Sequence, residues 1–258
     1  MTDDAQYHLG FGRSDLPEGC DLVLLSGDPG RSELLATEHL TDGRPLGRNR
    51  GLDSYLARLP GGRPVICATS GMGAPSMSIV VNELVQVGAR TIIRIGTSGS
   101  IQDDVRAGHV VIGSSALTNQ GAADDVAPVQ YPAAANPFLT VALARAATRL
   151  GVVHHVGTVA STDTFFEGQE RSASSANPHL LRRLVGTIDE YAGLGILSFE
   201  MEAGTLFKMG GVYGFAAGCV VGVVAQRTED ESVDLAEKDA AVDRAIRTAI
   251  EAADRWER

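Results

Sequence analysis

Residues Ser26 to Arg31 combine glycines, a proline and an arginine in a pattern typical of anion binding. The segment follows an apolar run and precedes a stretch of helical period. Such a strand-to-helix turn directs backbone N–H groups and the positive end of a helix dipole toward one point, which Arg31 can also reach. The pattern predicts an anion site, and an ordinary turn with a surface arginine fits it equally well.

Arg94 lies inside an otherwise apolar run, Thr91 to Ile95, that continues into the glycine-rich segment Gly96 to Gly99. Lone arginines are seldom buried without a partner, because removing the charge from water costs several kcal/mol. Arg94 therefore requires either a carboxylate or an anionic ligand, and the residues alone leave both possibilities open.

The stretch from Asp163 to Arg171 places Phe165 beside Gln169 and Arg171. An aromatic face stacks on a flat heterocycle, and an amide with a guanidinium supplies the donors and acceptor that match a carbonyl–NH–carbonyl edge. The pattern indicates a site for a heterocyclic base. A solvated loop with chance aromatics is the alternative.

Phe199 to Glu202 opens a segment of helical character in which two glutamates flank a methionine. If Met201 faces a pocket, Glu202 can accept hydrogen bonds from the paired hydroxyls of a sugar. Otherwise Met201 belongs to the core and the glutamates lie on the surface of the helix.

The elements that position these segments are apolar runs alternating with stretches of helical period, which is typical of an α/β layer architecture. We expect strands at Asp21–Leu25, Pro64–Thr69, Thr91–Ile95, His109–Ser114, His155–Ala160 and Ala216–Ala225. We expect helices at Pro75–Val87, Leu139–Leu150 and Lys238–Trp256, and a loop from Thr118 to Pro137. Residues 1–258 are interpreted as one domain.

Composition narrows the class of protein. With 258 residues, 44% of them hydrophobic and 21% charged, the chain can bury a full core, which excludes disorder and coiled coil. The net charge of −10 argues against nucleic acid as a partner. Gly211–Ala225 is too short and too rich in glycine to span a membrane, and the first residues lack a signal-peptide pattern. Three widely separated cysteines predict reduced thiols and a cytoplasmic protein.

In this order, Gly27–Arg31, Arg94–Gly99, Gln169–Arg171 and Glu200–Glu202 resemble the motifs of the nucleoside phosphorylase superfamily, most closely its bacterial uridine phosphorylase members. The resemblance runs from about Tyr7 to Thr228. It implies a single α/β domain whose twisted, mixed central sheet is partly barrel-like and flanked by helices. It implies self-association with active sites shared across a dimer, and a hexamer built from such dimers.

The resemblance also implies the reaction, which is reversible phosphorolysis of uridine to uracil and ribose 1-phosphate, with deoxyuridine and thymidine as further candidates. Bound phosphate would attack the anomeric carbon of the ribose. Inorganic phosphate is then a co-substrate, and no cofactor or metal is expected.

The same motifs imply the site residues. The phosphate site would comprise Gly27, Arg31, Arg94, Thr97 and an Arg50 lent by the neighbouring subunit. The ribose would be held by His8 from the neighbouring subunit together with Thr97, Met201 and Glu202. The base would be held by Phe165, Gln169, Arg171 and Arg227, and the catalytic residues would be Arg94, Thr97, Glu202 and Arg171.

Two departures from the family pattern bear on specificity. Members that cleave purine nucleosides carry an aspartate where this chain has Val223–Thr228, so Arg227 and the missing acid favour pyrimidines. Gly51 stands where an acidic residue of the relatives helps to bind a monovalent cation, which argues against that cation here.

Other functions stay open. A nucleosidase of the same fold would use water and would need neither Arg31 nor Arg94 at the attacking side. A purine or broad-specificity phosphorylase shares the motifs. A non-catalytic nucleoside-binding protein would keep the pocket without turnover. A dinucleotide-dependent dehydrogenase is disfavoured, because no GxGxxG motif follows the first strand.

Overall fold

The computed structural model describes residues 4–228, 233 and 235–257. Its strands are β1 (Leu22–Ser26), β2 (Thr41–Gly47), β3 (Ser54–Arg58), β4 (Pro64–Thr69), β5 (Thr91–Ser100), β6 (Val110–Asn119), β7 (His154–Thr162), β8 (Ser198–Glu200) and β9 (Ala216–Gln226). They form one mixed sheet in the order β2-β3-β4-β1-β5-β8-β7-β6-β9. The α/β class expected from the alternating pattern is confirmed.

The sheet closes on itself at one end. β9 pairs antiparallel with β6 and also parallel with β5, so β5, β8, β7, β6 and β9 form a ring. The other strands continue from β5 as an open extension, in which β1 is parallel to both β4 and β5. This arrangement confirms the partly barrel-like sheet that the resemblance implied.

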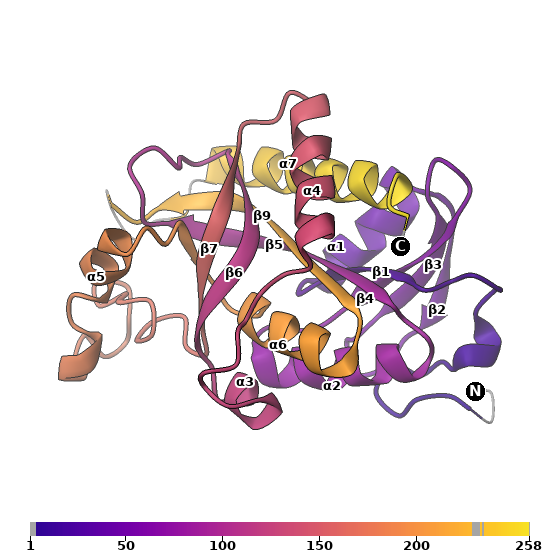
Figure 1. The fold of residues 1–258 in the computed structure, drawn as a ribbon, viewed down its shortest axis with the longest axis horizontal. Helices are drawn as coiled ribbons and strands as arrows, with labels where there is room; N and C mark the ends of the chain where they lie inside the picture. Colours follow the sequence, from indigo (N-terminus) through magenta and orange to yellow (C-terminus); the bar gives the residue numbers. More distant parts are fainter. Residues whose placement is uncertain (1–3, 229–232, 234, 258) are drawn as a thin grey trace.

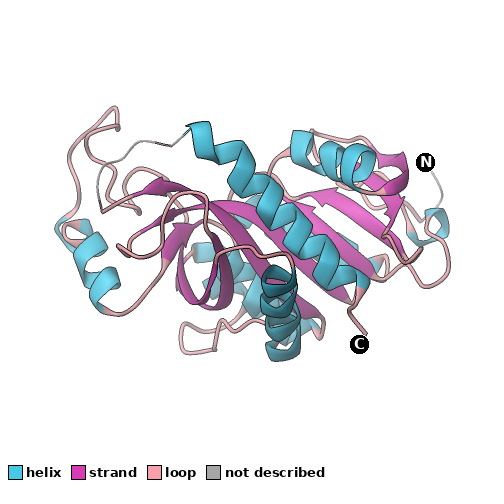
Figure 2. Ribbon diagram, turned by 90° about the horizontal axis from the view of Figure 1, so that it is seen from above, coloured by secondary structure: helices cyan, strands magenta, loops and turns pink. Residues whose placement is uncertain are grey.

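Helices cover both faces of the sheet. Their bounds are α1 (Pro29–Leu34), α2 (Ala74–Gln86), α3 (Gly121–Val126), α4 (Pro137–Arg149), α5 (Thr187–Gly193), α6 (Ala203–Tyr213) and α7 (Leu235–Asp254). Figure 1 shows α1, α4 and α7 on one face and α2, α3 and α6 on the other, with α5 in a projecting segment. From above, the long helix α7 crosses the strands diagonally and ends beside the C-terminus (Figure 2).

Successive residues of the central strands alternate between two cores, as expected for a sheet that is covered on both faces. In β1, Val23 packs in the core under α2 and α6, while Leu24 packs in the core under α4 and α7. In β5, Ile92 and Ile93 alternate in the same way. Arg94 therefore follows Ile92 onto the face covered by α2 and α6.

Six strands were expected from the sequence, and β2, β3 and β8 were missed. All six expected strands are confirmed within a few residues, and β5 and β6 extend about five residues beyond the expected ends. The expected loop from Thr118 to Pro137 is wrong at its start, because β6 continues to Asn119 and α3 follows at once. The alanines and aspartates of α3 have weak apolar periodicity, and Lys208 fixes the helix by donating to Asp124 and to the Ala127 and Pro128 carbonyls.

The structure also shows whether the cysteines are buried and whether any described helix could span a membrane. Cys20, Cys67 and Cys219 are buried and free, and burial raises the pKa of Cys20 to about 11. These thiols are therefore protonated core residues, as the spacing predicted. Among the described residues, every helix is too short or too polar to cross a lipid bilayer.

Candidate active site

The candidate site lies at the carboxyl ends of the parallel strands β1, β5 and β9. Open α/β sheets bind their ligands at this edge, because loops and helix N-termini converge there. The site is a pocket of about 560 Å³, which matches a small-molecule ligand. Its lining includes Gly27, Asp28, Arg31, Met72, Arg94, Thr97, Phe165, Gln169, Arg171, Phe199, Glu200, Met201, Glu202, Val224, Ala225, Val233 and Lys238.

Arg94 is buried against two carboxylates. Its Nε donates to Oε2 of Glu200 at 3.0 Å, and its Nη2 forms an ion pair with Glu202. Gly96 makes this arrangement possible, because a Cβ at that position would lie 2.8 Å from the Nη2 of Arg94. The sequence left open whether Arg94 meets a carboxylate or an anion, and the structure shows that it meets carboxylates from β8 and the start of α6.

The charges of this cluster perturb one another. Burial lowers the pKa of Arg94, but Glu202 and Glu200 outweigh it and raise the pKa above its ordinary value, so Arg94 stays charged. Burial raises the pKa of Glu202, while Arg94 opposes that shift. Arg94 also lines the pocket, so its guanidinium can meet a ligand there.

Arg31 supplies a second cation at the same end of the pocket. Its Nη1 donates to the Ser26 hydroxyl and to the Ile95 carbonyl, at 3.3 and 3.2 Å. Burial lowers the pKa of Arg31, Asp28 opposes that shift, and Arg94 lowers the pKa further. The surroundings thus lower the pKa of Arg31, and a bound anion would oppose that shift.

Gly27 and Thr97 complete this end of the pocket. Both line it, from the loop after β1 and from the end of β5. A Cβ on Gly27 would lie 3.2 Å from the carbonyl oxygen of Gly71, so this close approach favours glycine. The structure therefore brings together Gly27, Arg31, Arg94 and Thr97, as predicted for a phosphate site.

Glu202 joins the phosphate end to the opposite helix layer. It immediately precedes α6, and its Oε1 accepts from the N–H of Gly73 at 2.6 Å, just before α2. Met201 lines the same pocket, so the alternative of a purely core methionine is excluded. Each carboxylate oxygen has two lone pairs, so Glu202 can also accept from a ligand hydroxyl.

The opposite end of the pocket holds the residues predicted to bind a base. Gln169 and Arg171 are buried, and the Cζ of Arg171 lies 4.1 Å from the ring centroid of Phe165. The intervening Glu170 has φ 51°, which lets the residues on both sides of it face the pocket. Its carboxylate holds this turn by accepting from the Gly186 and Ile188 N–H groups. Because Arg171 lies over its ring, Phe165 both stacks on this guanidinium and borders the pocket.

Arg227 does not contribute to the lining of this pocket among the described residues. It is buried and donates to the backbone carbonyls of Gln169 and Glu170, at 2.9 and 3.3 Å. Arg227 thus supports the turn that carries Gln169, and its contact with the base stays a prediction. The side chain of Arg227 packs against Gly99, where a Cβ would lie 3.1 Å from Cγ of Arg227.

His8 and Arg50 lie outside this pocket and close to each other. The Nδ1 of His8 is 2.6 Å from Oε1 of Glu83, and the guanidinium of Arg50 lies over the Tyr7 ring at 6.0 Å. Asn49 ties the two segments together by donating to the Tyr7 carbonyl at 2.6 Å. One chain therefore does not bring His8 and Arg50 to Arg94.

The described residues contain no cluster of His, Cys, Asp or Glu that could hold a metal ion. Gly51, where the relatives' acidic residue would stand, has φ +74°. A side chain at Gly51 would therefore be strained.

The contacts of some residues in and around the pocket were not predictable from the sequence. Glu200 pairs with Arg94 across 106 residues, a contact that no local pattern reveals. Val233 and Lys238 line the pocket from the segment that leads into α7 and from α7 itself. A lysine near the start of an amphipathic helix has the sequence pattern of an ordinary surface residue, so no local signal predicted that Lys238 lines the pocket.

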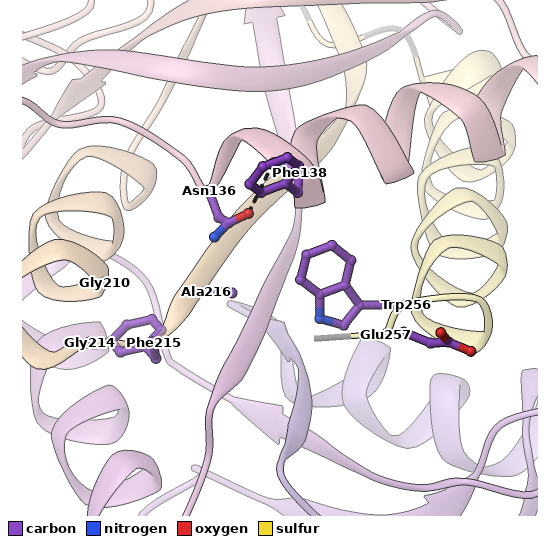
Figure 3. Close-up of a pocket in the computed structure, with 8 residues that line it drawn as sticks. All are labelled: Asn136, Phe138, Gly210, Gly214, Phe215, Ala216, Trp256 and Glu257. Carbon is purple, nitrogen blue, oxygen red and sulfur yellow. Dashed lines mark hydrogen bonds between the residues drawn. The ribbon is translucent and has the colours of Figure 1, made fainter.

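A second pocket, of about 530 Å³, lies where α4 begins and α6 ends (Figure 3). Phe138, Phe215 and Trp256 give it aromatic walls, and Glu257 adds a carboxylate. Ala216 is the first residue of β9, so this pocket lies at the opposite end of that strand from the Arg94 pocket. No described arginine or lysine lines it.

Comparison with known proteins agrees with the fold. The sequence profile of the phosphorylase superfamily matches residues 21–256, and the chain therefore belongs to this superfamily. Uridine phosphorylase of Salmonella typhimurium is 38% identical over 257 residues, with 99% of each chain covered, and uridine phosphorylase of Escherichia coli is 37% identical over the same coverage. Guanosine phosphorylase of Halorubrum lacusprofundi is 31% identical, over 96% of this chain and 97% of its own.

Proposed function

We propose that this protein is a uridine phosphorylase, which converts uridine and inorganic phosphate reversibly to uracil and ribose 1-phosphate. The observation that carries the proposal is that one pocket contains three groups of residues, each suited to one part of the substrates. Arg31 and Arg94 lie at one end, the Glu202 carboxylate lies beside them, and Gln169 with Arg171 lies at the other end. The names of the full-length relatives support the same substrate.

At the phosphate end, the oxyanion would bind between Arg31, Arg94, the Thr97 hydroxyl and the backbone of Gly27, which all line the pocket. A phosphate oxygen would form a bond to the anomeric carbon as the bond from that carbon to the base nitrogen breaks. Positive charge develops on the ribose in the transition state, and the phosphate and Glu202 are the negative groups placed to stabilise it. No protein nucleophile is needed.

At the base end, uracil leaves with the electron pair of the broken bond. Arg171 and the amide of Gln169 would donate to its carbonyl oxygens, where the negative charge accumulates. Uracil then takes a proton from water. The two ends of the pocket thus stabilise opposite charges at the same moment.

His8 and Arg50 would act on a neighbouring copy of the chain. They lie together at one corner, so a single contact between two chains would deliver both to the partner's pocket. We propose a dimer with shared sites, and a hexamer of such dimers. Free cysteines support a cytoplasmic location.

The pyrimidine preference rests on the end of β9. Val224 and Ala225 line the pocket, and β9 itself carries no carboxylate that could protonate a purine nitrogen there. Uridine, deoxyuridine and thymidine remain the proposed substrates. A nucleosidase would have no anion for Arg31 to bind at the attacking side of the pocket.

The experiment is uracil formation from uridine with and without phosphate, followed by ultraviolet absorbance, with guanosine as a parallel substrate. We expect turnover of uridine only when phosphate is present. Equal release in phosphate-free buffer would indicate a nucleosidase. Faster turnover of guanosine would indicate a purine phosphorylase, and no turnover in any condition would indicate a binding protein.

A further inference from the structure

Gln120 is a buried glutamine outside the pocket that the proposed reaction does not use. It has 1% of its surface exposed and immediately precedes α3, yet its side chain does not cap that helix. The Asp163 carboxylate accepts from the Gly121 N–H at the start of α3 instead, at 2.8 Å. The amide of Gln120 is thereby available for a different part of the fold.

Gln120 spans the segment that leads into α6. Its Nε2 donates to the Met201 carbonyl at 2.6 Å. Its Oε1 accepts from the N–H and from the hydroxyl of Thr205, at 3.1 and 3.0 Å. One side chain therefore holds the backbone on both sides of Glu202, although Met201 and Thr205 lie 81 and 85 positions from Gln120 in the sequence.

The other amides at the start of α6 are held by different side chains. The Glu200 carboxylate accepts from the N–H groups of Glu202 and Ala203, each at 2.8 Å. The Ser161 hydroxyl accepts from the Gly204 N–H at 2.8 Å and donates to Glu200. The N–H groups that a helix N-terminus normally leaves unsatisfied are thus all occupied by protein.

We propose that Gln120 is a positioning residue, which fixes the Met201 backbone and through it places the Glu202 carboxylate for the ribose hydroxyls. The inference rests on the proposed function of the pocket. Among the side chains that hold this segment, Gln120 alone bonds the Met201 carbonyl in the described part of the chain. Small displacements of a positioned group cost large factors in rate, so loss of this bond should affect catalysis selectively.

The variant is Gln120→Met, which keeps the length and volume of the side chain and removes both hydrogen-bonding groups. We expect kcat/KM for uridine to fall about tenfold and kcat/KM for 2′-deoxyuridine to fall less than about threefold, because deoxyuridine has one ribose hydroxyl fewer to align. The KM for phosphate should stay within about twofold of wild type.

Gln102→Met is the matched control. Gln102 also clamps two backbone carbonyls, those of Ala192 and Ile196 at 3.0 and 2.8 Å, but it holds the α5 region and does not line the pocket. We expect Gln102→Met to leave the ratio of the two nucleosides unchanged. An equal loss for both nucleosides in Gln120→Met, or no loss for either, would overturn the proposal.

Amide hydrogen exchange supplies a readout that does not depend on activity. Exchange at Glu202 and Ala203 should be faster in Gln120→Met than in wild type or in Gln102→Met, and unchanged exchange would overturn the proposal. If wild-type protein fails to cleave uridine, the proposed function fails while this measurement still decides the role of Gln120. If Gln120→Met does not fold, the shorter Gln120→Asn carries the same test, since it cannot span both contacts.

Discussion

Replacing Arg94 by methionine should expose the electrostatic design of the site. In the wild-type protein the Arg94 guanidinium is about 6% exposed and pairs with two carboxylates that are equally buried. Methionine fills much of the same volume without a charge. Glu200 and Glu202 would then face each other in the interior without a cation, which typically costs about 3–5 kcal/mol of unfolding free energy.

The loss should depend on pH with a definite sign. Without Arg94, the folded variant would bind a proton at the Glu200–Glu202 pair at pH values where the unfolded chain, with ordinary carboxyl pKa values, binds none. The unfolding free energy therefore falls as pH rises above the ordinary carboxyl range, by about 1.4 kcal/mol per pH unit until the pair ionises. We expect a small difference from wild type near pH 4.5 and the full loss near pH 8.

Urea unfolding followed by circular dichroism, at fixed protein concentration and at both pH values, measures this directly. Arg63→Met is the matched control, because Arg63 also pairs with a carboxylate, Asp21 at 2.7 Å, but both side chains are about 30% exposed. That variant should lose only about 0–1 kcal/mol, with little change between the two pH values. A loss in Arg94→Met that is below 1 kcal/mol at pH 8, or equal at both pH values, would refute the reasoning.

Three further predictions follow from individual contacts. Burial raises the pKa of Glu202, so the acid limb of kcat/KM for uridine should lie above the ordinary value of 4.5. Glu202→Gln should abolish this limb and lower kcat/KM by about 10–100-fold, and an unchanged limb in the variant would assign it to another group. Arg171→Met should raise the KM for uridine about tenfold and leave the KM for phosphate nearly unchanged in steady-state assays, and equal increases would contradict its place at the base end. Burial and His155 lower the pKa of His109 below 6.5, so between the folded and unfolded pKa values the unfolded chain binds more protons than the folded one. The melting temperature should therefore rise with pH through that range. His109→Gln should flatten this rise, and an unaltered slope would exclude His109 as its source.

Much of the fold was predictable because its central strands are buried on both faces. β1 and β4 are apolar runs bounded by turn residues, and such runs stand out in any sequence. β2 did not stand out, since its residues are mostly exposed and include two glycines and a proline. β8 has three residues and exists because β5 and β7 border it. The interpretation of residues 1–258 as a single domain stays a prediction.

The site was predictable in its residue types and only partly in its contacts. Glycine, arginine and carboxylate motifs at strand ends indicated which side chains meet, and the pocket contains most of them. The partners of Arg94 come from β8 and the start of α6, so the ion pair depends on long-range pairing of the sheet. The same limit applies to Gln120, whose contacts lie over 80 residues away.

The central claim is that bound phosphate itself attacks the ribose at the pocket formed by Arg31 and Arg94. Incubating the protein with uridine and phosphate that carries ¹⁸O at all four oxygens, followed by mass spectrometry of the sugar product, tests this most directly. The account predicts ribose 1-phosphate that retains all four heavy oxygens, with uracil formed in equal amount. Uracil accompanied by free, unphosphorylated ribose would contradict it.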